Sequence, residues 1–102
     1  VDGVLFTSGQ IPLNPATGSV AGSDIETQTE QVMRNLSAVL KEAGMDFENV
    51  VKTTCFIANM EYFSAFNQIY SKYFVSKPAR SCVEVSRLPK NVLVEVELIA
   101  KK

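Results

Sequence analysis

The sequence predicts an α+β fold in which two α-helices pack on one face of a mixed β-sheet. Two segments carry apolar residues at helical spacing, and four others are rich in β-branched residues or alternate apolar with polar side chains. The order is strand, helix, strand, helix, strand, strand, without an internal repeat. Because 102 residues are enough for one hydrophobic core, we expect residues 1–102 to form a single domain.

The first strand is expected over residues 3–10, where Val4, Leu5 and Phe6 form an apolar centre. Proline, asparagine and glycine recur between residues 12 and 22, which is typical of an irregular loop. The first strand and the first helix should therefore be joined by a connection without regular structure.

The first helix is expected to begin after Ser23 or Asp24, because either side chain can accept a hydrogen bond from the helix N-terminus. It should run to about Ala43, since Gly44 can adopt the left-handed conformation that ends many helices. Its apolar stripe, which we expect to face the core, consists of Ile25, Val32, Leu36, Val39, Leu40 and Ala43.

Residues 50–58 are β-branched and apolar and predict a buried strand, and residues 62–75 predict the second helix. One stripe of that helix is aromatic, which indicates packing rather than a cofactor site: Phe63, Phe66, Tyr70, Tyr73 and Phe74. Asn67 falls within this stripe. A buried amide without a partner costs about 1–3 kcal/mol, so Asn67 should be hydrogen-bonded, either to a loop backbone or within a functional site.

Alternate side chains of a strand share a face, and in the last two predicted strands this alternation decides which charged and apolar side chains lie together. After Pro78, the residues Arg80, Cys82 and Glu84 point one way. In residues 92–100 one face is wholly apolar, whereas the other carries Leu93, Glu95, Glu97 and Ile99. We expect the apolar face to pack against the helices, and its reverse to combine Arg80 and Cys82 with the acids.

That mixed face has two interpretations. It is either a solvated surface, with Arg80 in a salt bridge to Glu95 or Glu97 worth about 0–1 kcal/mol, or a surface covered by another subunit. Leu93 and Ile99 favour a covered face, because exposed aliphatic side chains forgo the free energy of burial. On a covered face Arg80, whose planar guanidinium makes paired bonds to a carboxylate, can anchor an acidic ligand.

Composition excludes several classes of function. The chain has no histidine, which removes Ser-His-Asp and Cys-His nucleophilic sites and every histidine-containing metal site. Cys55 and Cys82 do not form a Cys-x-x-Cys pair, so we expect no metal and a reducing compartment. A net charge of −1 without a basic run argues against nucleic acid, and no apolar run is long enough to span a membrane.

Six short motifs follow one another along nearly the whole chain. They are Phe6-Thr7-Ser8-Gly9-Gln10-Ile11-Pro12, Val50-Val51-Lys52-Thr53-Thr54, Phe66-Asn67-Gln68-Ile69-Tyr70, Pro78-Ala79-Arg80-Ser81-Cys82-Val83-Glu84-Val85, Leu88-Pro89-Lys90 and Val94-Glu95-Val96-Glu97. Together they closely resemble the signature of the reactive intermediate deaminase family, which is also called RidA/YjgF or endoribonuclease L-PSP. The resemblance implies a chorismate-mutase-like (YjgF) fold and a homotrimer with active sites between subunits.

The resemblance also implies roles for individual residues. Arg80 would anchor the substrate carboxylate, and Glu95, rather than its neighbour Glu97, would activate water; these two are the catalytic residues that it implies. The other residues that it places around the substrate are Ser8, Gly9, Asn67 and Cys82. Members of the family usually carry a further N-terminal segment whose tyrosine reaches the site, and we expect that segment to be missing or trimmed before Val1.

The reaction that the resemblance implies is hydrolysis of 2-iminobutanoate and 2-iminopropanoate to 2-keto acids and ammonia, in the cytoplasm. It needs no metal or cofactor, because a protonated imine is already electrophilic and positioning with a proton acceptor suffices. Two alternatives stay open. A regulatory protein that binds 2-keto acids without turnover would keep Arg80 but would not need Glu95. The endoribonuclease of the older family label is disfavoured by the acidic net charge and the lack of histidine.

Overall fold

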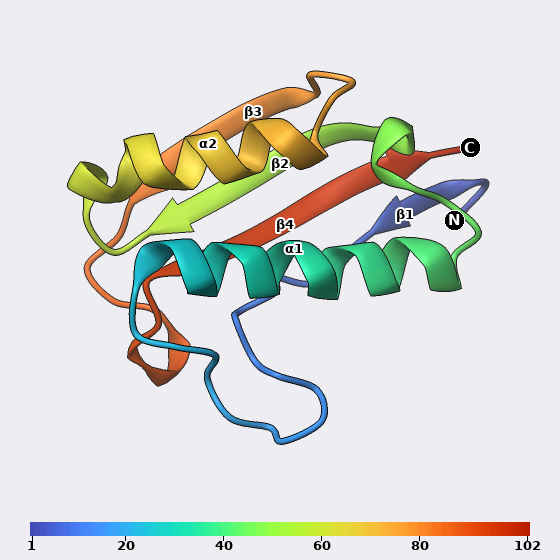
Figure 1. Cartoon of the computed structure of the whole chain (residues 1–102). Coiled ribbons are helices and arrows are strands. Elements are labelled where there is room, and N and C mark those ends of the chain that lie inside the picture. The colour runs from blue at the N-terminus through green and yellow to red at the C-terminus, as the bar shows by residue number, and fades with distance from the viewer.

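A computed structural model describes residues 1–102 as a four-stranded sheet with two helices on one of its faces (Figure 1). The predicted α+β architecture is therefore confirmed. No helix combines the length and the apolar character that a membrane crossing requires. The main elements in chain order are β1 (Val4–Phe6), α1 (Ile25–Glu42), β2 (Val50–Ile57), α2 (Phe63–Tyr73), β3 (Ala79–Glu84) and β4 (Val94–Lys101).

The sheet is mixed, with the strands in the order β1-β4-β2-β3. β2 and β3 are parallel, whereas the two other pairs are antiparallel. Adjacent parallel strands need a connection that returns along the sheet, and α2 is that connection. As a result α2 runs along β2 and β3, in front of the strand that carries Arg80 (Figure 1).

The first strand is shorter than the predicted residues 3–10, because it contains an irregularity. Beyond β1, the amide of Thr7 donates to Leu98, and Gln10 exchanges two backbone hydrogen bonds with Val96. Three steps along this segment therefore face two steps along β4, which is the geometry of a β-bulge. The extra residue lies in the Ser8–Gly9 segment and redirects it against β4.

Both predicted ends of α1 are confirmed. The Asp24 side chain accepts a hydrogen bond of 2.8 Å from the Thr27 amide at the N-terminus. At the other end Gly44 has a φ of 72°, and the amides of Gly44 and Met45 reach back to the carbonyls of the last turn. Short-range chemistry thus determines the length of this helix.

The apolar face of β4 forms the floor of the core, as its alternation predicted. Val94, Val96, Leu98 and Ala100 are all buried. The two helices pack over this floor and against each other, and the apolar side chains from them that are fully buried are Val32, Met33, Leu36, Leu40 and Phe66. Complete burial of an aliphatic or aromatic side chain contributes about 1.5–3 kcal/mol, so this one layer dominates the stability of the fold.

The loop between β1 and α1 is fixed by side-chain amides of α1 rather than by regular structure. Asn35 of α1 donates to the carbonyls of Ile11 and Leu13. Gln28 of the same helix donates to the Gly22 carbonyl and accepts from the Leu93 amide. These bonds hold the chain that follows Gly9 in place over the end of the sheet.

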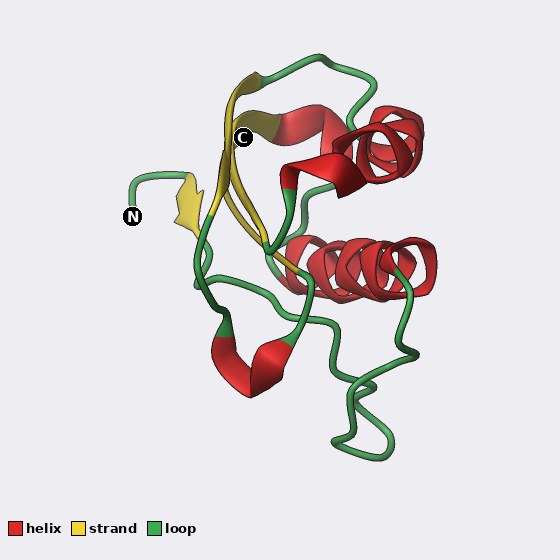
Figure 2. Cartoon of the chain, turned by 90° about the vertical axis from the view of Figure 1, so that its left-hand side faces the viewer, coloured by secondary structure: helices red, strands yellow, loops and turns green.

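The second face of the sheet is not covered by any element of the chain (Figure 2). Phe6 and Val83 lie there with 64% and 43% of their surface exposed. Ile99 also lies on this face, as predicted, but Leu93 packs partly against the core. The apolar part of the open face therefore depends on Phe6, Val83 and Ile99 and not on Leu93.

The Cys55 thiol makes the folded state sensitive to alkali. Burial, and secondarily the neighbouring Cys82, raises the pKa of Cys55 from 9.0 to about 12. A group whose pKa is raised on folding stabilises the fold fully below its unfolded pKa, and this contribution is lost as the pH rises through the folded pKa. We expect the melting temperature, measured by calorimetry, to fall between pH 9 and pH 12. The fall should be shallower in Cys55→Ala, and equal slopes in both proteins would contradict this cause.

Candidate functional site

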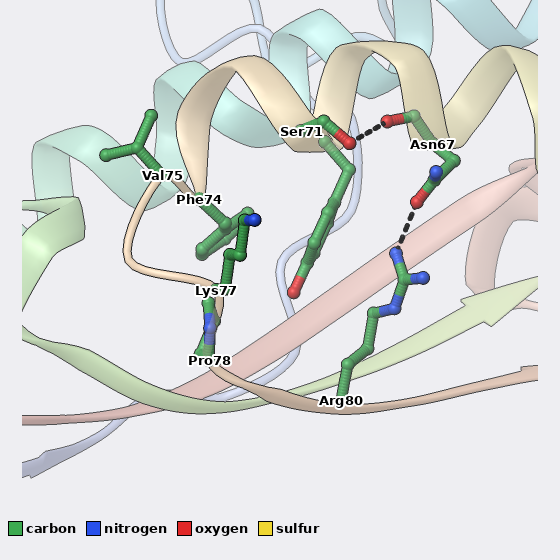
Figure 3. Close-up of a pocket in the computed structure, with 8 residues that line it drawn as sticks. Asn67, Ser71, Phe74, Val75, Lys77, Pro78 and Arg80 are labelled. Carbon is green, nitrogen blue, oxygen red and sulfur yellow. Dashed lines mark hydrogen bonds between the residues drawn. The ribbon is translucent and has the colours of Figure 1, made fainter.

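Arg80 extends from β3 toward α2, where its guanidinium is held by a side chain of the helix. Its Nη1 donates a hydrogen bond of 2.6 Å to Oδ1 of Asn67 (Figure 3). The partner of the amide in the aromatic stripe is thus an arginine and not a loop backbone. Both side chains are half-buried. Since Asn67 is an uncharged acceptor, the positive charge of Arg80 stays available for an anion.

Two aromatic rings of α2 lie against the same guanidinium. The Cζ atom of Arg80 is 4.5 Å from the centroid of Tyr70 and 5.3 Å from that of Phe63. The Tyr70 hydroxyl forms a hydrogen bond of 2.8 Å with the hydroxyl of Thr53, which is fully buried on β2. Burial is the main cause that raises the pKa of Tyr70, so the phenol is neutral at physiological pH.

A groove of about 600 Å³ opens beside Arg80, between α2 and the start of β3. Its lining contains two cations, Lys77 and Arg80, and no carboxylate. Such a lining attracts anions. The residues around the groove are Asn67, Tyr70, Ser71, Phe74, Val75, Lys77, Pro78 and Arg80 (Figure 3).

Cys82 follows Arg80 on the same face of β3, and its thiol is half-buried. Burial raises the pKa of Cys82, and the nearby Arg80 opposes that rise only in part. A thiol with a raised pKa is protonated at neutral pH and is a poor nucleophile. The chemistry of Cys82 is therefore that of a weak hydrogen-bond donor and a small packing group.

Glu95 belongs to a second group of residues, formed by β4 and the bulge after β1. Gly9 lies directly against the Glu95 carboxylate, so closely that a Cβ atom at position 9 would collide with it. Ser8, the exposed neighbour of Gly9, lies in the same bulged segment. The bulge and the missing side chain of Gly9 together make room for the acid.

The two groups lie on opposite faces of the sheet, which corrects the expectation that Arg80 shares a face with Glu95 and Glu97. Arg80 and Cys82 pair with Thr53 and Cys55 of β2, which are buried beneath the helices. Glu95 and Glu97 instead pair with the alternate residues of β2, Phe56 and Thr54. Directly paired residues point to the same side of a sheet, so the acids point away from Arg80, and the salt bridge considered above does not form.

Distance reinforces this separation. β2 lies between β3 and β4, which places the two strands about 10 Å apart. A small molecule held by Arg80 therefore cannot reach Glu95 of the same chain. Each chain therefore carries one candidate half-site with Asn67, Arg80 and Cys82, and another with Ser8, Gly9 and Glu95.

The first half-site can bind and orient an anion, and the second can accept a proton. No cluster of three or more histidine, cysteine, aspartate or glutamate side chains is placed to hold a metal ion. The sequence interpretation missed Tyr70, which it assigned to packing, and also Ser71 and Lys77. For Tyr70 a signal existed, because it follows Asn67 by three positions and therefore shares its side of the helix.

Comparisons with known proteins agree with this architecture. The family model described as Endoribonuclease L-PSP matches residues 1–102. A Lactococcus lactis protein named "Putative regulator AldR" is 63% identical over 102 residues, covering 99% of this chain and 81% of the relative. The solved YjgF gene product of E. coli has a TM-score of 0.92 at 41% identity, covering 98% of this chain and 81% of that one. The solved E. coli TdcF with bound serine gives the same TM-score and coverage at 38% identity.

The raised pKa of Cys82 predicts slow alkylation. At pH 7.5 we expect iodoacetamide to modify Cys82 more slowly than free cysteine, and Cys55 more slowly still, because fewer thiolates are present and both thiols are shielded. Mass spectrometry of peptides over time measures both rates. The matched control is Ser64→Cys in a Cys82→Ser background, since position 64 is exposed on α2. Equal rates for Cys82 and the control would contradict the assignment.

Proposed function

Since this chain belongs to the endoribonuclease L-PSP family, also known as the RutC or Rid (YjgF) family, we propose that it hydrolyses reactive 2-imino acids. The proposed substrates are 2-iminobutanoate and 2-iminopropanoate, and the products are 2-keto acids and ammonia, formed in the cytoplasm. The observation that carries the proposal is the guanidinium of Arg80, held by Asn67 beside a groove that contains no carboxylate. The relative with bound serine, itself a small carboxylic acid, supports the substrate class.

The proposed enzyme is a homotrimer with its active sites between subunits. One chain cannot bring Arg80 and Glu95 together, because the two point to opposite sides of the sheet. A closed ring of copies can do so, since each copy then offers its Arg80 half-site to one neighbour and its Glu95 half-site to the other. The exposed Phe6 and Val83 on the open face supply apolar area that such an assembly would cover.

Binding begins with the carboxylate of the imino acid. The guanidinium of Arg80 donates one N–H to Asn67. Its other N–H groups remain available to the ligand, so two parallel charge-assisted bonds can form. These bonds fix the direction in which the C=N carbon points. The half-buried position of Arg80 strengthens the attraction, because fewer water molecules compete for the charge.

The chemical step needs one water molecule and one base. The Glu95 carboxylate of the neighbouring copy accepts a proton from water as the oxygen adds to the C=N carbon. Glu95 gives this proton to the nitrogen of the resulting carbinolamine and the C–N bond breaks. The hydroxyl proton passes to the departing ammonia, so ammonium leaves as the carbonyl of the 2-keto acid forms. Glu95 is thereby unchanged overall. General base catalysis of this kind contributes about 10²–10⁴-fold.

A second candidate function is a regulator that binds 2-keto acids without turnover. The relative named "Putative regulator AldR", at 63% identity, favours it. Such a protein would use the Arg80 half-site alone. The ribonuclease of the family description has less support, because the chain has no histidine and a net charge of −1.

A coupled assay tests the deaminase. A pyridoxal-phosphate dehydratase generates the imino acid, and release of 2-keto acid is followed with and without this protein. We expect acceleration by the native chain, a loss of at least about 100-fold in Arg80→Ala and Glu95→Gln, and retained activity in the control Glu97→Gln. Keto-acid binding through Arg80 without any acceleration would instead establish the regulator.

A mixing experiment tests whether sites are shared between chains. Arg80→Ala and Glu95→Gln chains are each inactive, but a neighbouring pair in one order has both intact groups at a shared site. When the two are unfolded and refolded together in equal amounts, about a quarter of the sites should be intact by random assembly around a closed ring. Regained activity near that fraction, with none in either variant refolded alone, is the expected result. No regain in mixed oligomers verified by mass spectrometry would place both groups in one chain's site and overturn the arrangement.

A further inference from the structure

We propose that Tyr70 is a positioning residue that orients the Arg80 guanidinium for carboxylate binding through its ring face, with Thr53 fixing the ring in place. The inference rests on the proposed function, in which Arg80 receives the substrate carboxylate. It concerns a residue that makes its contribution through Arg80 rather than by reacting itself.

The geometry is that of a cation on an aromatic face. The Cζ atom of Arg80 lies 4.5 Å from the centroid of the Tyr70 ring, well within the range of about 6 Å over which the ring attracts a cation. Phe63 contributes a second ring at 5.3 Å. Attraction to a ring face leaves the N–H groups at the guanidinium edge free to donate hydrogen bonds, whereas an ion pair with a carboxylate would occupy them.

Asn67 alone cannot fix this orientation. Its single hydrogen bond reaches only Nη1, so the guanidinium could still swing about that contact. The ring of Tyr70 adds a plane against which the guanidinium rests, and the two contacts together define both its position and its tilt. The bond to Asn67 is the only hydrogen bond of the Arg80 side chain, so its other N–H groups stay free to bind a ligand (Figure 3).

The Tyr70 ring is itself held in place by Thr53 and Phe74. Its hydroxyl is bonded at 2.8 Å to Thr53, which is fully buried, and its second face stacks on Phe74 at a centroid distance of 4.4 Å. Thr53 also pairs directly with Arg80 across β2 and β3. The register of β2 and β3 thus places Arg80 directly beside Thr53, whose hydroxyl holds the Tyr70 ring. The sheet therefore determines the position of the ring as well as that of the guanidinium.

The test distinguishes the effect of the ring's charge distribution from the effect of its shape. Tyr70→Phe keeps the ring and removes the bond to Thr53, whereas Tyr70→pentafluorophenylalanine keeps nearly the same shape and reverses the ring quadrupole. Tyr73→Phe is the matched control, because it removes one hydroxyl bond, to Glu30, from the same helix. All are compared with the native chain in the assembled state, with thermal unfolding as the check on folding.

The first readout needs no ligand. Side-chain nitrogen NMR of the free protein reports the environment and rotation of the Arg80 guanidinium. We expect a displaced Arg80 signal with faster rotation in the pentafluorophenylalanine protein, an intermediate change in Tyr70→Phe and none in Tyr73→Phe. Unchanged Arg80 signals in the fluorinated protein would overturn the proposal.

The second readout is the affinity for 2-ketobutyrate, the product of the proposed reaction of 2-iminobutanoate, by calorimetric titration. The fluorinated protein should bind about tenfold more weakly than Tyr70→Phe. In an Arg80→Ala background the two should not differ, because Tyr70 acts only through Arg80, whereas a merely structural role would persist there. Equal affinities with Arg80 intact would overturn the proposal. If the native chain binds no 2-keto acid, the proposed function fails, and the NMR result still decides whether Tyr70 orients Arg80.

Discussion

The pairing of β2 with its two neighbours is the constraint on which both the core and the candidate site depend. Pairing with β3 aligns Thr53 and Cys55 with Arg80 and Cys82. Pairing with β4 aligns the same two buried residues with the apolar face of β4. Because side chains alternate, a slip of one residue between β2 and β3 would turn Arg80 away from α2 and abolish its contact with Asn67. Packing of the core therefore holds the register that the site needs.

The consequence of this register is a chain with two incomplete half-sites. The face under the helices has a guanidinium that can bind an anion, and the open face presents an acid against Gly9. In a monomer these functions would be unrelated. In a closed assembly each interface would join one of each kind, so oligomerisation and catalysis would arise from the same contact.

The proposed chemistry is modest, and the scaffold suits it. Without histidine the chain lacks the side chain that most readily takes up and releases protons near neutral pH. An electrophilic imine, however, needs only an oriented water molecule and a carboxylate. What the protein supplies instead is rigidity. Arg80 lies on a strand, and its partners Asn67 and Tyr70 lie on a helix that packs on that strand, so little side-chain entropy would be lost in the proposed binding.

The sequence by itself determined the elements whose causes are local: the capping Asp24, the left-handed Gly44 and the alternation along β4 each specify a structure within a few residues. It did not determine the end of β1, because the bulge after β1 depends on pairing with β4. The sequence also indicated Arg80, Asn67, Gly9 and Glu95 through a resemblance of motifs, although not which of them meet. Only the tertiary structure decided that Arg80 and Glu95 lie on opposite faces. Alternation fixes which residues share a face within one strand, whereas the relation between strands depends on long-range pairing that neither strand's pattern contains. The role of Tyr70 emerged for the same reason, since packing brings together a helix and a strand whose proximity no local pattern reveals.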